Sequence, residues 1–128
     1  MCAPSVMRVV LFDFLKGCCR LVDSPVPDFR SEAEAHAAEQ FPKEACGLVV
    51  DGDYWRCRNI ADNPEQDFVI SPVDWARAML SGTIEAVVHS HPDGGPASEA
   101  DRRACTGTKL PWHIWSMPEE QWSIINPC

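Results

Sequence analysis

Short blocks of apolar residues, separated by turn-forming residues, follow one another along most of the chain. Residues 45–50 and 84–88 are the most continuous of these blocks, and such short apolar runs are typical of buried strands. Asp51-Gly52-Asp53 follows the first block and is a hairpin signal. The pattern therefore predicts a sheet whose central strands are covered on both faces.

Helix signals lie between these strands. Ser31 with Glu34 has the pattern of a capping box before an alanine-rich stretch that Pro42 ends, and Ser71-Pro72 resembles a second helix start. The expected order is helix 31–41, strands 45–50, 54–60 and 68–70, helix 72–80, strand 84–91, helix 98–106, and strands 112–117 and 121–125. This order predicts an α/β (α+β) fold, a mixed β-sheet sandwiched by helices.

Length and composition indicate one globular domain. The chain has 128 residues, of which 45% are hydrophobic and 23% charged, an ordinary balance for a packed core. Residues 1–30 end in a linker-like stretch with two prolines. We expect an N-terminal extension of unknown role over residues 1–30 and a single domain over residues 31–128.

Charge and cysteine content exclude several classes of function. The net charge of −8, from 19 acidic and 11 basic residues, argues against a nucleic-acid partner, which requires clustered Lys and Arg. Because apolar runs fall short of the ~18 residues of a membrane span, we expect no membrane partner. The seven cysteines include no C-x-x-C pair, which excludes a four-cysteine zinc ribbon and favours a reducing, cytoplasmic setting.

The strongest chemical signal is His89-Ser90-His91-Pro92 at the end of the second apolar block. Residues i and i+2 of a strand point to the same face, so both imidazoles can be directed at one point. Asp101, on the next expected helix, can return a carboxylate to that point. Two imidazoles and a carboxylate are a typical ligand set for a catalytic zinc.

Each of these residues also has a purely structural interpretation. The histidines can be ordinary polar residues at a strand end, and Ser98-x-x-Asp101 nearly matches a capping box. In the structural alternative Ser98 only caps its helix. In the functional one its hydroxyl donates to a developing oxyanion, and the two roles compete for the same oxygen.

Three acids compete for the role of general base. Glu44 lies just before the first buried strand, Glu85 is at even spacing from His89, and Asp93 follows His91 directly. Glu44 is the preferred spare acid, although a solvated charge at a helix end is its ordinary interpretation.

The remaining histidines and cysteines carry weaker signals. We expect His36 at the surface of the first helix and His113 packed in a strand rather than bound to a metal. A helical H-E-x-x-H and the H-x-E with P-C-x-x-C of nucleobase deaminases are both absent from the sequence. Cys46 lies close to Glu44 as a potential nucleophile, but no local signature supports it.

Taken together, Glu44, H-S-H-P and S-x-x-D resemble the JAMM (MPN-plus) metallopeptidase motif. The resemblance covers about residues 31–127 and includes Pro42-Lys43-Glu44-Ala45-Cys46-Gly47, Cys57-Arg58-Asn59, Ser71-Pro72-x-Asp74 and Pro111-Trp112-His113-Ile114. These added segments look like the N-terminal half of the tail assembly K family of lambda-type phages. The segment between His91 and Ser98, six residues here, is one residue shorter than is usual in the family.

This resemblance implies a fold, a cofactor and roles for the site residues. The fold is the MPN/JAMM fold, related to that of cytidine deaminases. His89, His91 and Asp101 bind one Zn²⁺ per chain, Glu44 is the general base, and Ser98 stabilises the oxyanion. The related tail proteins continue into an NlpC-type cysteine peptidase domain, which here is missing or lies on a separate chain.

The sequence thus predicts a zinc-dependent metallopeptidase or isopeptidase. Its expected setting is the host cytoplasm or the virion tail, and its expected substrate is a peptide or isopeptide in another tail protein or in peptidoglycan. The first alternative is a non-catalytic structural or assembly module of a phage tail that keeps the fold. The second is a metal-dependent hydrolase that does not act on peptides.

Overall fold

A five-stranded mixed sheet forms the centre of the protein in the computed structural model, which describes residues 28–128. The strands are β1 (Cys46–Val50), β2 (Asp53–Cys57), β3 (Ile84–His91), β4 (Trp112–Ser116) and β5 (Gln121–Ile125), in the order β2-β1-β3-β4-β5. Only β3 and β4 run parallel, and the other neighbouring pairs are antiparallel. The predicted mixed sheet is therefore confirmed.

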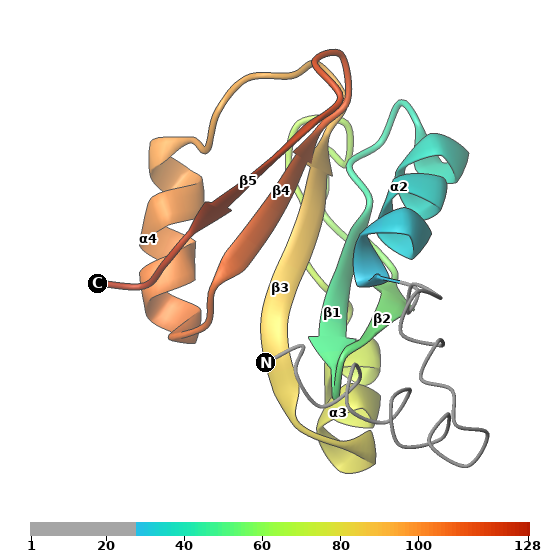
Figure 1. Cartoon of the computed structure of the whole chain (residues 1–128), viewed down its shortest axis with the longest axis vertical. Coiled ribbons are helices and arrows are strands. Elements are labelled where there is room, and N and C mark those ends of the chain that lie inside the picture. The colour runs from blue at the N-terminus through green and yellow to red at the C-terminus, as the bar shows by residue number, and fades with distance from the viewer. Residues whose placement is uncertain (1–27) are drawn as a thin grey trace, which may run out of the picture.

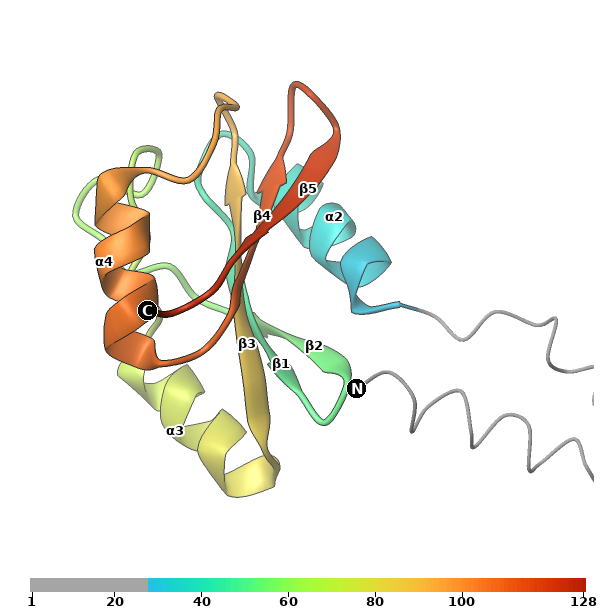
Figure 2. The same cartoon turned by 60° about the vertical axis from the view of Figure 1, so that its left-hand side comes forward.

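Helices cover both faces of this sheet, as Figures 1 and 2 show. Helix α2 (Phe29–Gln40) packs on one face, and α3 (Pro72–Ser81) and α4 (Glu99–Thr108) lie on the other. Strand β1 contributes side chains to the hydrophobic cores on both faces of the sheet. Leu48 and Val50 belong to the core under α3 and α4, and Val49 belongs to the core under α2. Of the helices in residues 28–128, none has the length and apolar character needed to cross a membrane.

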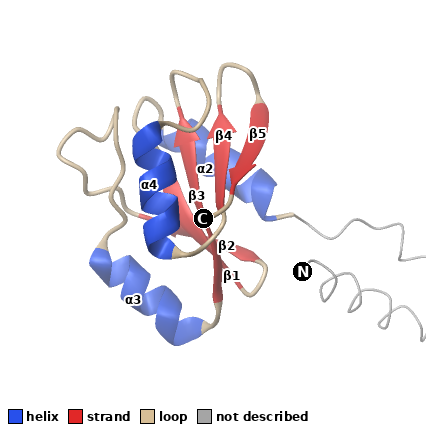
Figure 3. Cartoon of the chain, turned by 90° about the vertical axis from the view of Figure 1, so that its left-hand side faces the viewer, coloured by secondary structure: helices blue, strands red, loops and turns tan. Residues whose placement is uncertain are grey.

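Strand β3 occupies the middle of the sheet, between β1 and β4. Its residues 86–90 are all buried, and Val87 packs with the α3/α4 core while Val88 packs with the α2 core. The loop after β3 crosses to the start of α4 on the α3/α4 side (Figure 3). The end of β3 therefore faces α4 at one edge of the fold.

The first helix begins earlier than the capping pattern predicts. Asp28, not Ser31, is its N-cap, and the Asp28 carboxylate accepts a hydrogen bond from the Arg30 N–H (3.2 Å). Glu34 is not part of a capping box, because its carboxylate accepts a bond from the Trp122 indole instead (2.8 Å). Phe29 packs edge-on against Trp122, so contacts with β5 favour the earlier start.

Three further expectations on local structure are wrong. Strand β2 ends at Cys57, and residues 68–70 form no strand but a single bridge between Asn59 and Ile70. His36 is not on the surface: it is only 4% exposed, and its Nδ1 lies 2.7 Å from the Tyr54 hydroxyl. Its burial follows helix periodicity, because Ala33 and Ala37 on the same face are also buried.

Candidate metal centre

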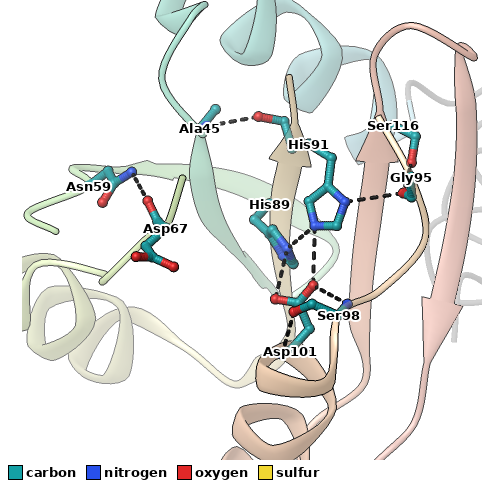
Figure 4. A network of polar contacts seen from close by, with 10 residues as sticks. Ala45, Asn59, Asp67, His89, His91, Gly95, Ser98, Asp101 and Ser116 are labelled. Atoms are coloured by element: carbon teal, nitrogen blue, oxygen red, sulfur yellow. Dashed lines mark hydrogen bonds and ion pairs between the residues drawn. The ribbon is translucent and has the colours of Figure 1, made fainter. Parts of the chain in front are cut away.

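The two histidines of β3 converge as their spacing predicts. His89 is 1% exposed and His91 is partly buried, and their Nε2 atoms lie 3.2 Å apart. Phe68 stacks on the His89 ring, with the ring centroids 4.4 Å apart. Both imidazoles therefore point to one place on the α3/α4 side of the sheet (Figure 4).

Asp101 brings the third donor group from the first turn of α4. One carboxylate oxygen, Oδ2, lies 3.2 Å from His91 Nε2, and the other, Oδ1, lies 3.5 Å from His89 Nε2. Within residues 28–128, these three side chains are the only group of three or more metal-binding side chains whose donor atoms converge. The carboxylate is thus directed at both imidazoles (Figure 4).

The donor atoms lie close enough together to share one zinc ion. Zinc–ligand distances of 2.0–2.1 Å require tetrahedral donors to lie about 3.3 Å from one another. The Nε2–Nε2 distance of 3.2 Å and the 3.2 Å from His91 Nε2 to Asp101 Oδ2 are close to that edge length, while His89 Nε2 lies 3.5 Å from the other carboxylate oxygen, Oδ1. Two neutral imidazoles and one carboxylate also match the donor chemistry of zinc and leave a fourth position for water.

A hydrogen bond orients one of the two imidazoles, and aromatic packing orients the other. His91 Nδ1 lies 3.2 Å from the Gly95 carbonyl, which fixes the proton on Nδ1 and leaves the Nε2 lone pair free for a metal. His89 Nδ1 is buried and finds no hydrogen-bond partner within residues 28–128. Aromatic packing from Phe68 and Trp112 holds that ring instead.

The charges at this centre favour an anionic carboxylate between two imidazoles. Burial alone would raise the pKa of Asp101, but hydrogen bonds from His89 and His91 outweigh it and hold the pKa far below its usual range. The bond to Asp101 raises the pKa of His91, whereas burial lowers the pKa of His89. The set therefore presents one negative charge to a cation.

Ser98 and Asp101 do form a capping box at the start of α4. The Ser98 hydroxyl oxygen accepts a bond from the Asp101 N–H (3.0 Å), and Asp101 Oδ2 accepts one from the Ser98 N–H (2.9 Å). The capping and metal-facing roles of Asp101 thus coexist in one side-chain position. The capping bond also fixes the carboxylate toward the imidazoles.

Glu44 lies at the same centre, directly before β1. It is 8% exposed and lines a pocket of about 370 Å³ together with His91, Ser98 and Asp101. Its carboxylate makes no hydrogen bond to any other residue of the described chain. Burial raises the pKa of Glu44 to about 8, a range suited to taking up and releasing a proton near neutral pH.

Among the rival residues, only Asp93 shares the pocket with Glu44. Glu85 accepts a bond from the Gly52 N–H (3.0 Å) at the β1–β2 hairpin, whereas Asp93 lines the pocket. His113 packs edge-on against Phe29, under α2 (5.0 Å between ring centroids), so the packed-histidine interpretation is confirmed. Burial raises the pKa of the Cys46 thiol strongly, which argues against a thiolate nucleophile.

Two residues that hold Glu44 were missed by the motif-based reasoning. Ser90 accepts a bond from the Ala45 N–H through Oγ (2.8 Å) and donates its own N–H to the Ala45 carbonyl (3.0 Å). Asn59 donates to the Glu44 carbonyl (2.9 Å). It also donates to the Asp67 carbonyl (3.0 Å), as Figure 4 shows. The available signals were the serine inside H-S-H and an asparagine at a strand end.

Comparison with known proteins gives matches over most of the chain. Residues 27–125 match the family of prokaryotic homologues of the JAB domain. Tail tip assembly protein K of Escherichia phage N15 is 45% identical over 98 residues, which cover 73% of this chain and 40% of that protein. The protein of the same name from Escherichia phage lambda is 54% identical over 46 residues, 35% of this chain and 23% of that protein. The chain thus spans less than half the length of either curated relative.

Among solved structures, the protein DSY2949 from Desulfitobacterium hafniense has the same fold. The TM-score is 0.61 at 26% sequence identity, over 75% of this chain and 76% of that one. The sheet and its flanking helices are therefore an arrangement that a solved protein shares.

Proposed function

The chain belongs to the family of prokaryotic homologues of the JAB domain, and from that premise we propose that it is a zinc-dependent peptidase or isopeptidase. The observation that carries the proposal is the convergence of the His89, His91 and Asp101 donor atoms beside an unpartnered, buried Glu44. An acid of this kind next to three metal-binding donors is what hydrolysis by an activated water requires.

The proposed chemistry assigns one task to each side chain. A zinc ion held by His89, His91 and Asp101 would supply Lewis acidity, which acidifies water and polarises a carbonyl. Glu44 takes a proton from the attacking water and delivers it to the leaving nitrogen, so that the C–O bond forms and the C–N bond breaks. Burial raises the pKa of Glu44 to about 8, and the positive charge of a bound zinc ion would offset part of that rise.

Ser98 takes part through its hydroxyl hydrogen. Its oxygen accepts the helix-capping bond from Asp101, and a hydroxyl that accepts through a lone pair still has its hydrogen to donate. Ser98 also lines the pocket, where we assign that hydrogen to the developing oxyanion. In this proposal the oxygen caps the helix while the hydrogen donates to the oxyanion, so the two roles do not exclude each other.

The proposed setting follows the relatives. Both curated relatives are named tail tip assembly proteins, so we place this protein in the virion tail or in the host cytoplasm during assembly. The proposed substrate is a peptide or isopeptide in another tail protein or in peptidoglycan. The same names favour one alternative, a non-catalytic assembly module, because they describe assembly and not cleavage.

Metal content and turnover separate these two functions. Untagged protein is analysed for zinc and then incubated with a panel of peptides and isopeptides. Glu44→Gln should keep one zinc per chain and lose turnover by about 10²–10⁴-fold, the usual effect of removing a general base. Glu99→Gln is the matched control, because Glu99 is exposed on α4 and does not line the pocket.

Two results decide against the peptidase. Zinc-loaded wild-type protein that cleaves no member of the panel favours the assembly module. Loss of zinc in Glu44→Gln would make Glu44 a ligand and overturn its assignment as the base.

A further inference from the structure

The pocket has more acidic residues than the proposed reaction uses. Besides Glu44 and Asp101, it is lined by Glu65 and Asp67 from the loop before α3 and by Asp93 from the loop after β3. No lysine or arginine is among the lining residues within the described chain. The loop before α3 and the loop after β3 therefore both add negative charge to the pocket.

These three carboxylates are also unpaired, unlike some acids elsewhere in the protein. Glu39 pairs with Arg56 and Asp74 with Arg58, whereas Glu65, Asp67 and Asp93 form no ion pair within residues 28–128. Unpaired charges of one sign around a cleft concentrate the electric field inside it and attract ligands of the opposite sign. The buried Glu44 carboxylate lies within this field, since Asp67 and Asp93 both contribute to its raised pKa.

The two loops that carry these acids are held by backbone hydrogen bonds. Asp67 donates its N–H to the Asn63 carbonyl (3.0 Å), and its own carbonyl accepts from the Asn59 side chain (3.0 Å). Asp93 lies in a turn closed by the bond from the Gly94 N–H to the His91 carbonyl (3.0 Å). The backbone that carries Asp67 and Asp93 is thus held close to the candidate metal centre.

We propose that the rim formed by Glu65, Asp67 and Asp93 selects substrates that carry an ammonium or guanidinium group within about two residues of the scissile amide. This inference rests on the proposed function, and it names the class of substrate that the site takes. A divalent cation would be balanced by Asp101 and Glu44, so the three rim charges remain to be matched by the substrate. A substrate with a carboxylate at the same place is repelled.

The expected preference is moderate, because the rim is exposed to solvent. One exposed ion pair changes an affinity by a factor of about 1.5–5, so two or three of them together predict a preference of roughly 10-fold. The preference should weaken with salt, because exposed charges are screened.

The test uses acetylated hexapeptides that differ at one position beside the scissile amide. That position is lysine, norleucine or glutamate, and a fourth peptide has norleucine with a free N-terminal amine. Binding to zinc-loaded Glu44→Gln is measured by NMR titration at low and high salt, and kcat/KM is measured with wild-type protein. The lysine and free-amine peptides distinguish a side-chain cation from a terminal one.

We expect the cationic peptides to bind about 10-fold tighter than acetylated norleucine at low salt, and glutamate to bind weakest. The triple variant Glu65→Gln, Asp67→Asn and Asp93→Asn should abolish the difference, whereas Glu99→Gln should keep it. Equal binding of lysine and norleucine, a preference that survives the triple substitution, or no binding of any peptide overturns the inference. Charge-selective binding without turnover by wild-type protein instead refutes the peptidase and leaves the charge preference standing.

Discussion

Ser98 combines a structural and a proposed catalytic task, and substitution separates them. Its Oγ accepts the capping bond from the Asp101 N–H at 3.0 Å, while its hydrogen is free for a substrate oxygen. Ser98→Ala removes both functions, so it should lower both stability and turnover. Ser98→Gly removes the hydroxyl as well but remains an acceptable N-cap residue.

The two losses have different sizes. An N-cap serine replaced by alanine costs about 1 kcal/mol, and by glycine only a few tenths. About 1 kcal/mol lowers the melting temperature of a domain of roughly 100 residues by about 4–8 °C. A lost oxyanion donor lowers kcat by about 10²–10³-fold, which is far more than an N-cap alone would cause.

Thermal denaturation and kcat of the two variants test this reasoning. Both should lose kcat to the same extent, but only Ser98→Ala should show the larger fall in melting temperature. Asp28→Ala is the control, because it removes the N-cap of α2 and should lower the melting temperature without changing kcat. Unchanged kcat in both Ser98 variants refutes the donor role, and equal melting temperatures in the two refute the cap.

Three further predictions concern the metal, the buried histidine and the loop before α3. Zinc at 100 times its Kd should stabilise the wild-type protein by roughly 2.7 kcal/mol in thermal melts. His91→Ala should no longer bind zinc and should show no such stabilisation. Burial lowers the pKa of His36 to about 4 from 6.5, so its contribution to stability is complete above pH 6.5 and is lost as pH falls toward 4. Urea denaturation at each pH should therefore show up to about 3 kcal/mol of this loss in wild type and a flatter profile in His36→Gln. Asn59→Ala should lower the free energy of unfolding by about 3 kcal/mol in the same assay. The substitution leaves two carbonyls, of Glu44 and Asp67, and two N–H groups, of Ala61 and Val69, without their hydrogen-bond partner.

The sheet and the convergence of the two histidines were predictable because they depend on local periodicity. Strand residues alternate between faces, so His89 and His91 share a face wherever β3 lies in the sheet. The hairpin after β1 was equally predictable from the sequence. Asp51 and Gly52 adopt the positive φ angles of 48° and 90° that Asp-Gly turns favour.

The missed features depend on contacts between distant segments. Ser31 and Asp28 are both good N-cap residues, and only the packing of Phe29 against Trp122 and His113 selects the earlier start. The role of Asn59 was hidden for the same reason. Its side chain joins the Glu44 carbonyl to the loop that contains Asp67, and no local pattern predicts which carbonyls an asparagine will meet.

The shortened loop after His91 does not by itself argue against catalysis. Gly94 and Gly95 take φ angles of 84° and 93°, which glycine adopts at little cost, so the chain turns sharply and reaches Ser98 with six residues. The Gly95 carbonyl also accepts hydrogen bonds from His91 Nδ1 (3.2 Å) and the Ser116 hydroxyl (2.9 Å). The short loop thus orients a proposed ligand and ties it to β4, while Asp101 still reaches both imidazoles. If the protein proves inactive, the cause should be sought at His89, whose Nδ1 has no partner within the described residues, and not in the loop.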